Sequence, residues 1–138
     1  MNYTNLLKKD LQYGEGKEND IKSKLESYFK CNLEKTSKLN LFDYVDNDKK
    51  ILIELKSRRN DKMKYPTTMV GYNKIINSIE KIKDSWKIYY VFNFTDKITY
   101  YKFEEINDSW ISKGGRYDRG RPEFKQYYFI PVELLSDI

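Results

Sequence analysis

The chain has 138 residues, of which 39% are hydrophobic and 34% charged, and its formal net charge is +5 at pH 7. This length and apolar share suit one core of ordinary size, so a single domain over residues 1–138 is expected. The chain contains no histidine and one cysteine, Cys31, which excludes histidine bases, Ser-His-Asp triads, histidine metal sites and an internal disulfide. Any metal chemistry must therefore use oxygen ligands, which favours Mg²⁺ or Mn²⁺ over Zn²⁺.

Hydropathy and charge predict the cellular location of the protein and the charge of its partner. No apolar run reaches the length of about 18 residues that a membrane helix needs, and the first ten residues lack a signal-type apolar stretch. We therefore expect an intracellular protein, in the cytoplasm, nucleoid or nucleus, with no membrane contact. The positive excess favours a polyanionic partner, although an AT-rich genome would also produce many lysines.

The first predicted elements are a helix and a strand hairpin. Residues 17–30 carry apolar side chains at helical spacing, namely Ile21, Leu25, Tyr28 and Phe29. Residues 39–46 predict a strand with Leu41, Asp43 and Val45 on one face, and residues 46–48 predict a turn. Residues 50–57 predict the next strand, which has Glu54 and Lys56 on one face because side chains alternate along a strand. The two strands and their turn form a hairpin.

A basic loop and a second helix follow this hairpin. Residues 58–65 predict the loop, and Thr67 or Thr68 is expected to cap a helix over residues 69–83. The apolar stripe of this helix is expected to face the core and consists of Tyr72, Ile75, Ile76, Ile79 and Ile82. Gly71 falls inside the predicted helix and indicates a close backbone approach.

The remaining predicted elements are mostly strands. Residues 86–94 and 98–103 predict a second hairpin, residues 113–125 a loop rich in glycine and arginine, residues 126–130 a strand, and residues 132–135 a short helical end. This order predicts an α/β chain of the α+β kind, with a central mixed β-sheet flanked by helices.

The first hairpin brings two carboxylates and a lysine together. Burial of Asp43 among apolar neighbours would cost several kcal/mol unless the carboxylate is paired or binds a cation. Asp43 and Glu54 can hold Mg²⁺ together with substrate phosphate oxygens. Lys56 can orient the attacking water, accept its proton or stabilise the pentavalent phosphate. Taken alone, Glu-x-Lys on a strand is more often a solvated ion pair worth roughly 0–1 kcal/mol.

The segments Leu41-Phe42-Asp43-Tyr44 and Ile51-Leu52-Ile53-Glu54-Leu55-Lys56 resemble the signature of the PD-(D/E)XK nuclease superfamily, and the likeness covers about residues 14–94. It implies a restriction endonuclease-like core, Asp43 and Glu54 as metal ligands, and Lys56 acting on the attacking water. It also implies an acid early in the first helix that completes the metal shell, for which Glu18 fits better than Glu15. Phe42 stands where the family usually has a proline, and the second helix lacks the Gln-x-x-x-Tyr pattern.

Basic residues near these acids are candidates for contact with a nucleic-acid backbone. They are Arg58, Arg59 and Lys64 in the first basic loop, Lys74 in the second helix, and Arg116, Arg119 and Arg121 in the later loop. The planar fork of arginine suits phosphate, and such contacts weaken strongly as salt rises. The alternative for each segment is an ordinary solvated loop or surface lysine.

These features predict a Mg²⁺- or Mn²⁺-dependent endonuclease that hydrolyses phosphodiester bonds. DNA is the expected substrate because most members of the resembled superfamily act on it, and a homodimer is common there because two strands must be cut. One alternative is a nucleic-acid binding module that kept the fold and lost catalysis. Another is a structural or protein-interaction domain without a nucleic-acid role.

Overall fold

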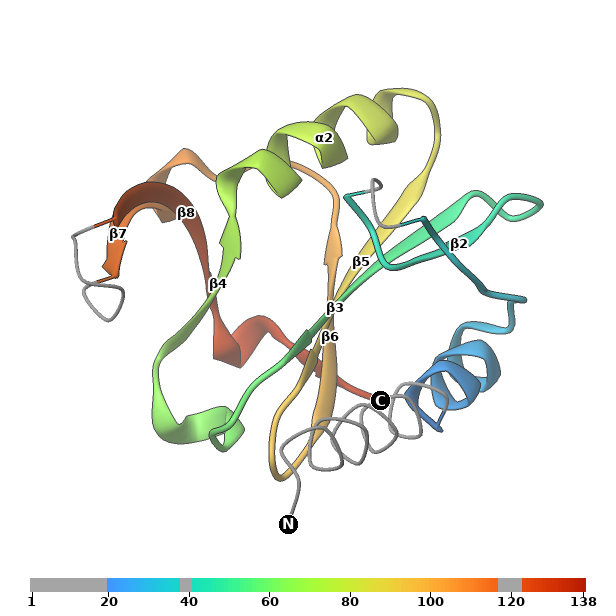
Figure 1. Cartoon of the computed structure of the whole chain (residues 1–138), viewed down its shortest axis with the longest axis horizontal. Helices are drawn as coiled ribbons and strands as arrows, with labels where there is room; N and C mark the ends of the chain where they lie inside the picture. The colour runs from blue at the N-terminus through green and yellow to red at the C-terminus, as the bar shows by residue number, and fades with distance from the viewer. Residues whose placement is uncertain (1–19, 38–40, 117–122) are drawn as a thin grey trace, which may run out of the picture. The chain divides into compact units, whose positions relative to one another are not determined.

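The computed structural model describes residues 20–37, 41–116 and 123–138, and the chain forms two compact units, Met1–Leu33 and Glu34–Ile138 (Figure 1). In the first unit, residues 20–29 are helical, which confirms the described part of the predicted helix. Ile21 and Leu25 are buried one turn apart, as the helical spacing requires. The helix ends at Lys30, which adopts the left-handed conformation with φ 53°, and Cys31 follows as a buried residue.

The second unit contains a mixed sheet of six strands among its described residues, in the order β1-β2-β3-β5-β6-β9. The strands are β1 (Glu34–Lys35), β2 (Tyr44–Asp46), β3 (Ile51–Ser57), β5 (Lys87–Asn93), β6 (Ile98–Phe103) and β9 (Ser136–Asp137). β3 and β5 are parallel and the other neighbouring pairs are antiparallel. Residues 51–54 are buried on both faces of the sheet, as is usual where a strand has a parallel neighbour.

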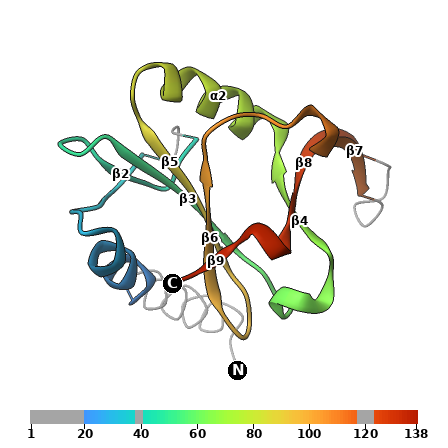
Figure 2. The same ribbon diagram turned by 180° about the vertical axis from the view of Figure 1, so that it is seen from behind.

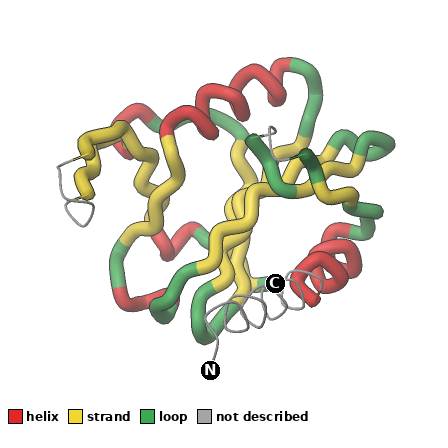
Figure 3. The backbone as a smooth tube through the Cα atoms, viewed as in Figure 1, coloured by secondary structure: helices red, strands yellow, loops and turns green. Residues whose placement is uncertain are grey.

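A smaller antiparallel sheet has the order β4-β8-β7, and its strands are β4 (Thr67–Gly71), β8 (Glu123–Pro131) and β7 (Ile111–Arg116). Helix α2 (Tyr72–Lys83) follows β4 directly and contacts β4, β5 and β8, so it joins the two sheets (Figures 1 and 2). Figure 3 shows the sheets as two groups of yellow strands with this helix across their upper ends. Short 3-10 turns are η1 (Lys62–Lys64), η2 (Asp108–Trp110) and η3 (Val132–Leu134).

The core of this unit draws side chains from both sheets and from α2. Fully buried members include Val70 from β4, Ile75 from α2, Tyr90 and Phe92 from β5, and Tyr128 and Ile130 from β8. Burial of such side chains contributes roughly 1.5–3 kcal/mol each, so the core fixes α2 against β5. The observed α+β architecture with a mixed sheet confirms the predicted fold class.

The predicted helix start was wrong. Thr67 and Thr68 belong to β4 rather than to a helix cap, and α2 begins only at Tyr72, with Gly71 as its N-cap residue. The reason is tertiary: β4 pairs with β8 along its whole length, and β-branched residues suit that pleated position. A Cβ on Gly71 would lie 2.8 Å from Asn73 Oδ1, the end of a flexible side chain that can move away, so the structure does not show the close backbone approach expected at this glycine.

Other boundaries also differ from the prediction. Residues 113–116 and 123–125 are strand rather than loop, because β7 and β8 pair from Ile111 opposite Tyr128 to Arg116 opposite Glu123. Residues 117–122 lie outside the described residues. Of the predicted strand over residues 39–46, Tyr44–Asp46 form β2, residues 41–43 bend instead, and residues 39–40 lie outside the described residues. On α2, Ile76 is 43% exposed, so the apolar stripe is narrower than expected.

Candidate active site

Asp43 lies in the bend before β2 and is attached to β3 by two hydrogen bonds. Its backbone N–H donates to the Ile53 carbonyl at 2.9 Å, and its Oδ2 accepts from the Leu55 N–H at 2.7 Å. These two contacts flank Glu54 on β3. From the opposite side, the Thr36 N–H donates to the Asp43 carbonyl at 2.9 Å. The local register of the hairpin therefore holds the Asp43 carboxylate beside Glu54.

The burial of Asp43 was predicted wrongly. Asp43 is exposed, whereas its neighbour Phe42 is 1% exposed and joins the core. The bend over residues 41–43 replaces the expected strand and turns Phe42, rather than Asp43, inward. The buried acid of this cluster is Glu54, at 3% exposure.

Glu54 is held between two lysine ammonium groups. Its Oε1 is 3.2 Å from Lys56 Nζ and its Oε2 is 3.2 Å from Lys74 Nζ. Burial raises the pKa of the Glu54 carboxyl, the nearby charge of Asp43 raises it further, and the two lysines oppose these effects without cancelling them. A carboxylate that stays costly to ionise beside two cations is typical of a functional site.

Lys74 reaches Glu54 from the first turn of α2. Its ammonium also donates to the Leu41 carbonyl, so it joins α2 to the segment that carries Asp43. The Lys74 carbonyl accepts hydrogen bonds from Ser78 Oγ at 2.9 Å and from the Tyr90 hydroxyl at 3.2 Å. Tyr90 is the register partner of Glu54 on β5. The parallel pair and the helix therefore fix Lys74 relative to Glu54.

Lys74 was predicted only as a candidate for phosphate contact, and its ion pair with Glu54 was not expected. One signal was available: Ser78 lies one turn after Lys74, where a hydroxyl can bond the carbonyl of the preceding turn. That pattern alone could not have located the distant carboxylate.

The donor set fits a hard divalent cation. Asp43 and Glu54 supply carboxylate oxygens close enough for the charge of one to raise the pKa of the other. A divalent ion between them would relieve that repulsion, and Mg²⁺ commonly takes one or two carboxylates with water and substrate phosphate. In the described ranges no group of three acidic, cysteine or histidine side chains forms a metal cluster. Glu18, the third predicted ligand, lies outside the described residues.

The basic residues predicted to contact nucleic acid differ in how many contacts they make with the rest of the protein. Arg58 donates from Nε to Thr68 Oγ1 at 3.3 Å and from Nη2 to the Met69 carbonyl, so it joins β3 to β4. Arg59 and Lys64 are exposed. Arg116 ends β7, and its side chain lies outside the description; Arg119 and Arg121 lie outside the described residues altogether.

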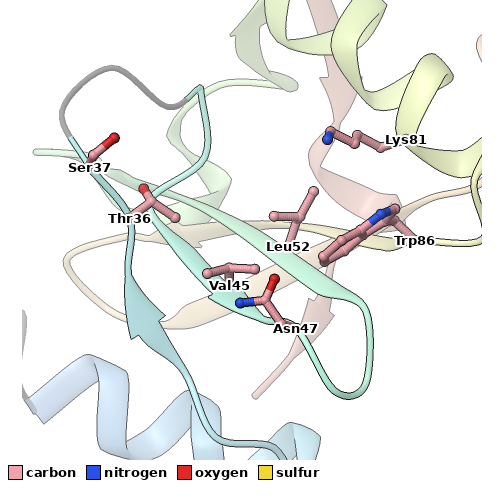
Figure 4. Close-up of a pocket in the computed structure, with 7 residues that line it drawn as sticks. All are labelled: Thr36, Ser37, Val45, Asn47, Leu52, Lys81 and Trp86. Atoms are coloured by element: carbon pink, nitrogen blue, oxygen red, sulfur yellow. The ribbon is translucent and has the colours of Figure 1, made fainter.

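A separate cavity of about 310 Å³ is lined by Leu52, which precedes Glu54 by two residues on β3 (Figure 4). Polar groups of Thr36, Asn47 and Lys81 and the indole of Trp86 line it. The ammonium groups of Lys50 and Lys81 lie 5.9 and 5.8 Å from the Trp86 ring centre. The two lysines therefore place positive charge beside the Trp86 ring that lines this cavity.

Comparison with known proteins agrees with this geometry. The model of a family described as "Phage putative PDDEXK endonuclease" matches residues 10–136, which is most of the chain. The chain belongs to this family, and through it to the PD-(D/E)XK nuclease superfamily. No curated protein and no solved structure matches the chain. Family membership supports a nuclease-like function, and superfamily members generally use divalent metals.

No helix in the described parts of the chain has both the length and the apolar character needed to cross a membrane.

Proposed function

We propose that this protein is a Mg²⁺- or Mn²⁺-dependent endonuclease that hydrolyses phosphodiester bonds of DNA. The observation that carries the proposal is a buried Glu54 held by Lys56 and Lys74, with Asp43 bonded to β3 on both sides of it. A structural ion pair would not need a second carboxylate whose charge makes Glu54 harder to ionise. Membership of an endonuclease family supports the same reaction class.

Each side chain has a distinct role in the proposed reaction. Asp43 and Glu54 would hold the divalent cation, which when bound polarises the scissile phosphate and lowers the pKa of a water molecule. Lys56, kept 3.2 Å from Glu54 Oε1, would orient the attacking water and stabilise the charge that grows on the phosphate. Lys74 would act as a positioning residue, because it fixes the second oxygen of Glu54 and the backbone beside Asp43.

The wider proposal concerns partners and organisation. We propose that Arg58, Arg59 and Lys64 contact the DNA backbone, together with Arg116, Arg119 and Arg121, and that Glu18 completes the metal shell. The chain is proposed to act as a single domain over residues 1–138, inside the cell, and as a homodimer when two strands are cut. Backbone contacts of this kind predict binding that weakens steeply with salt.

The test is cleavage of supercoiled plasmid, branched and single-stranded DNA with Mg²⁺, with Mn²⁺ and with a chelator. We expect metal-dependent cleavage that Glu54→Ala abolishes while far-UV circular dichroism stays unchanged. Glu80→Ala is the matched control, since Glu80 is an acid on α2 that pairs only at the surface with Lys83. Wild-type cleavage by Glu54→Ala would remove the proposal. Salt-sensitive binding without metal-dependent cleavage would instead identify a binding module on a nuclease fold.

A further inference from the structure

A second cavity lies farther along β3, past the acidic cluster. It has a volume of about 360 Å³ and opens where the chain leaves β3 and enters β4. Arg58 lines it and lies on the same face of the strand as Glu54 and Lys56, because side chains alternate. The Arg58 N–H continues the ladder to the Asn93 carbonyl at 2.9 Å. Four residues of extended chain separate Arg58 from Glu54 by about 13 Å along the backbone.

The lining of this cavity combines apolar rings with positive charge. Tyr65, Met69, Phe94 and Phe129 contribute apolar surface, and Arg58 and Lys62 contribute cations. Tyr65 is 54% exposed and Met69 is 40% exposed, although burial of such side chains would normally be favourable. An exposed apolar surface edged by cations matches a ligand that is itself flat, apolar on its faces and negatively charged nearby.

Tyr65 and Arg58 are arranged for such a ligand. The Lys64 ammonium lies over one face of the Tyr65 ring, 5.6 Å from the ring centre, and the Tyr65 side chain is exposed enough for a ligand ring to reach it. The Arg58 guanidinium lies 5.8 Å from the Phe92 ring centre and bonds Thr68 and Met69. These contacts use two of its five N–H groups and hold the side chain rigid, so the remaining donors are fixed in space.

We propose that this cavity receives one unpaired nucleobase of the substrate strand, with its ring stacked on Tyr65 and its phosphate bound by Arg58 and Lys64. The cavity volume matches a site for a small ligand, and stacking on an aromatic ring with neighbouring cations is how proteins bind single-stranded nucleic acid. A base inside an intact duplex cannot enter, because it must first leave the stack. The inference rests on the proposed nuclease function and names locally unpaired nucleic acid as the substrate class.

The test measures binding in a chelator, where a metal-dependent enzyme cannot cut. The probes are a fluorescein-labelled thymidine strand of about ten nucleotides and an abasic strand of equal length, followed by fluorescence anisotropy. We expect the full-length wild-type chain to bind the thymidine strand about tenfold more tightly than the abasic strand. Tyr65→Ala should lose most of this preference, whereas Tyr65→Phe should keep it because the ring remains.

A control separates this effect from a general loss of apolar surface. Ile76 is an exposed apolar residue of α2 that does not line the cavity, so Ile76→Ala should keep the preference for bases. Equal affinity of the wild type for both strands would overturn the inference, as would an unchanged preference in Tyr65→Ala. Both binding results are independent of cleavage. Metal-dependent cleavage without base preference would therefore overturn only the base-binding role of the cavity. Base preference without any cleavage would overturn only the proposed nuclease activity.

Discussion

Replacing Lys74 with methionine keeps a side chain of similar length but removes the ammonium that lies 3.2 Å from Glu54 Oε2. Glu54 stays buried and is left with Lys56 as its ion-pair partner. Breaking a buried pair by removing one partner typically costs about 3–5 kcal/mol. Because Lys56 remains, we expect Lys74→Met to lower the free energy of unfolding by about 2–3 kcal/mol above neutral pH.

The pH dependence of this loss identifies its cause. Burial and Asp43 hold the pKa of Glu54 above its usual value of 4.5, and removal of Lys74 takes away a group that lowers it. A carboxyl whose pKa is higher in the folded state than in the unfolded state destabilises the fold once it ionises. Below the unfolded pKa the carboxyl is neutral in both states. The loss should therefore be largest near about pH 8 and fade toward about pH 4.

The assay is urea unfolding followed by far-UV circular dichroism at these two pH values. For a chain of this length the expected loss at the higher pH corresponds to a fall in Tm of about 7–10 °C. Lys83→Met is the matched control on the same helix, because Lys83 and Glu80 are 70% and 68% exposed and lie 3.6 Å apart. Such surface pairs contribute about 0.3–0.5 kcal/mol. A loss in Lys74→Met that is equal at both pH values would refute the assignment to the Glu54 charge.

Three further substitutions test the same arrangement. Tyr90→Phe removes a buried hydroxyl and should cost about 1–2 kcal/mol in denaturant unfolding, and no measurable loss would contradict its hydrogen-bonded role. Ile75→Ala should lower the free energy of unfolding by about 2–5 kcal/mol, since Ile75 is 0% exposed, whereas Ile76→Ala should lower it by under about 1 kcal/mol. Equal losses would contradict the assignment of Ile75 to the buried face of α2 and of Ile76 to its exposed face. Asp43→Asn removes a charge that raises the pKa of Glu54, so ionised Glu54 should be less costly to the fold in this variant. Denaturant unfolding above neutral pH should therefore show no loss of stability, while cleavage is lost; a less stable variant would contradict this.

The acidic cluster was predictable because its geometry is local. β3 begins with an apolar run, and the alternation of side chains along it places Glu54 and Lys56 on one face. A turn of a few residues connects it to the preceding strand β2, which makes the two strands antiparallel neighbours. Asp46 Oδ1 accepts from the Lys49 N–H at 3.0 Å, which is the turn that the Asp-Asn-Asp run predicted. Register within such a hairpin places Asp43 beside Glu54 without knowledge of the rest of the fold.

The second lysine and the small sheet were beyond local patterns. Lys74 reaches Glu54 across 20 residues of chain, and its position depends on where α2 begins. That start was predicted three residues early, because the strand character of β4 depends on β8, more than 50 residues later. Described residues at the ends of the β7–β8 pair, such as Lys113 and Lys125, are exposed, so the apolar alternation that marks a half-buried strand is missing there.

The parallel pairing of β3 with β5 also determines when the acidic cluster takes shape during synthesis. Glu54 leaves the ribosome long before Tyr90, its partner in the ladder, and the whole of α2 is translated between them. A nascent chain that stops short of β5 has both acids but lacks the strand whose tyrosine anchors the backbone of Lys74. A fragment that ends before Lys87 therefore contains Asp43, Glu54 and Lys74 but lacks the strand that fixes the Lys74 backbone, so translation must pass β5 before the cluster is complete.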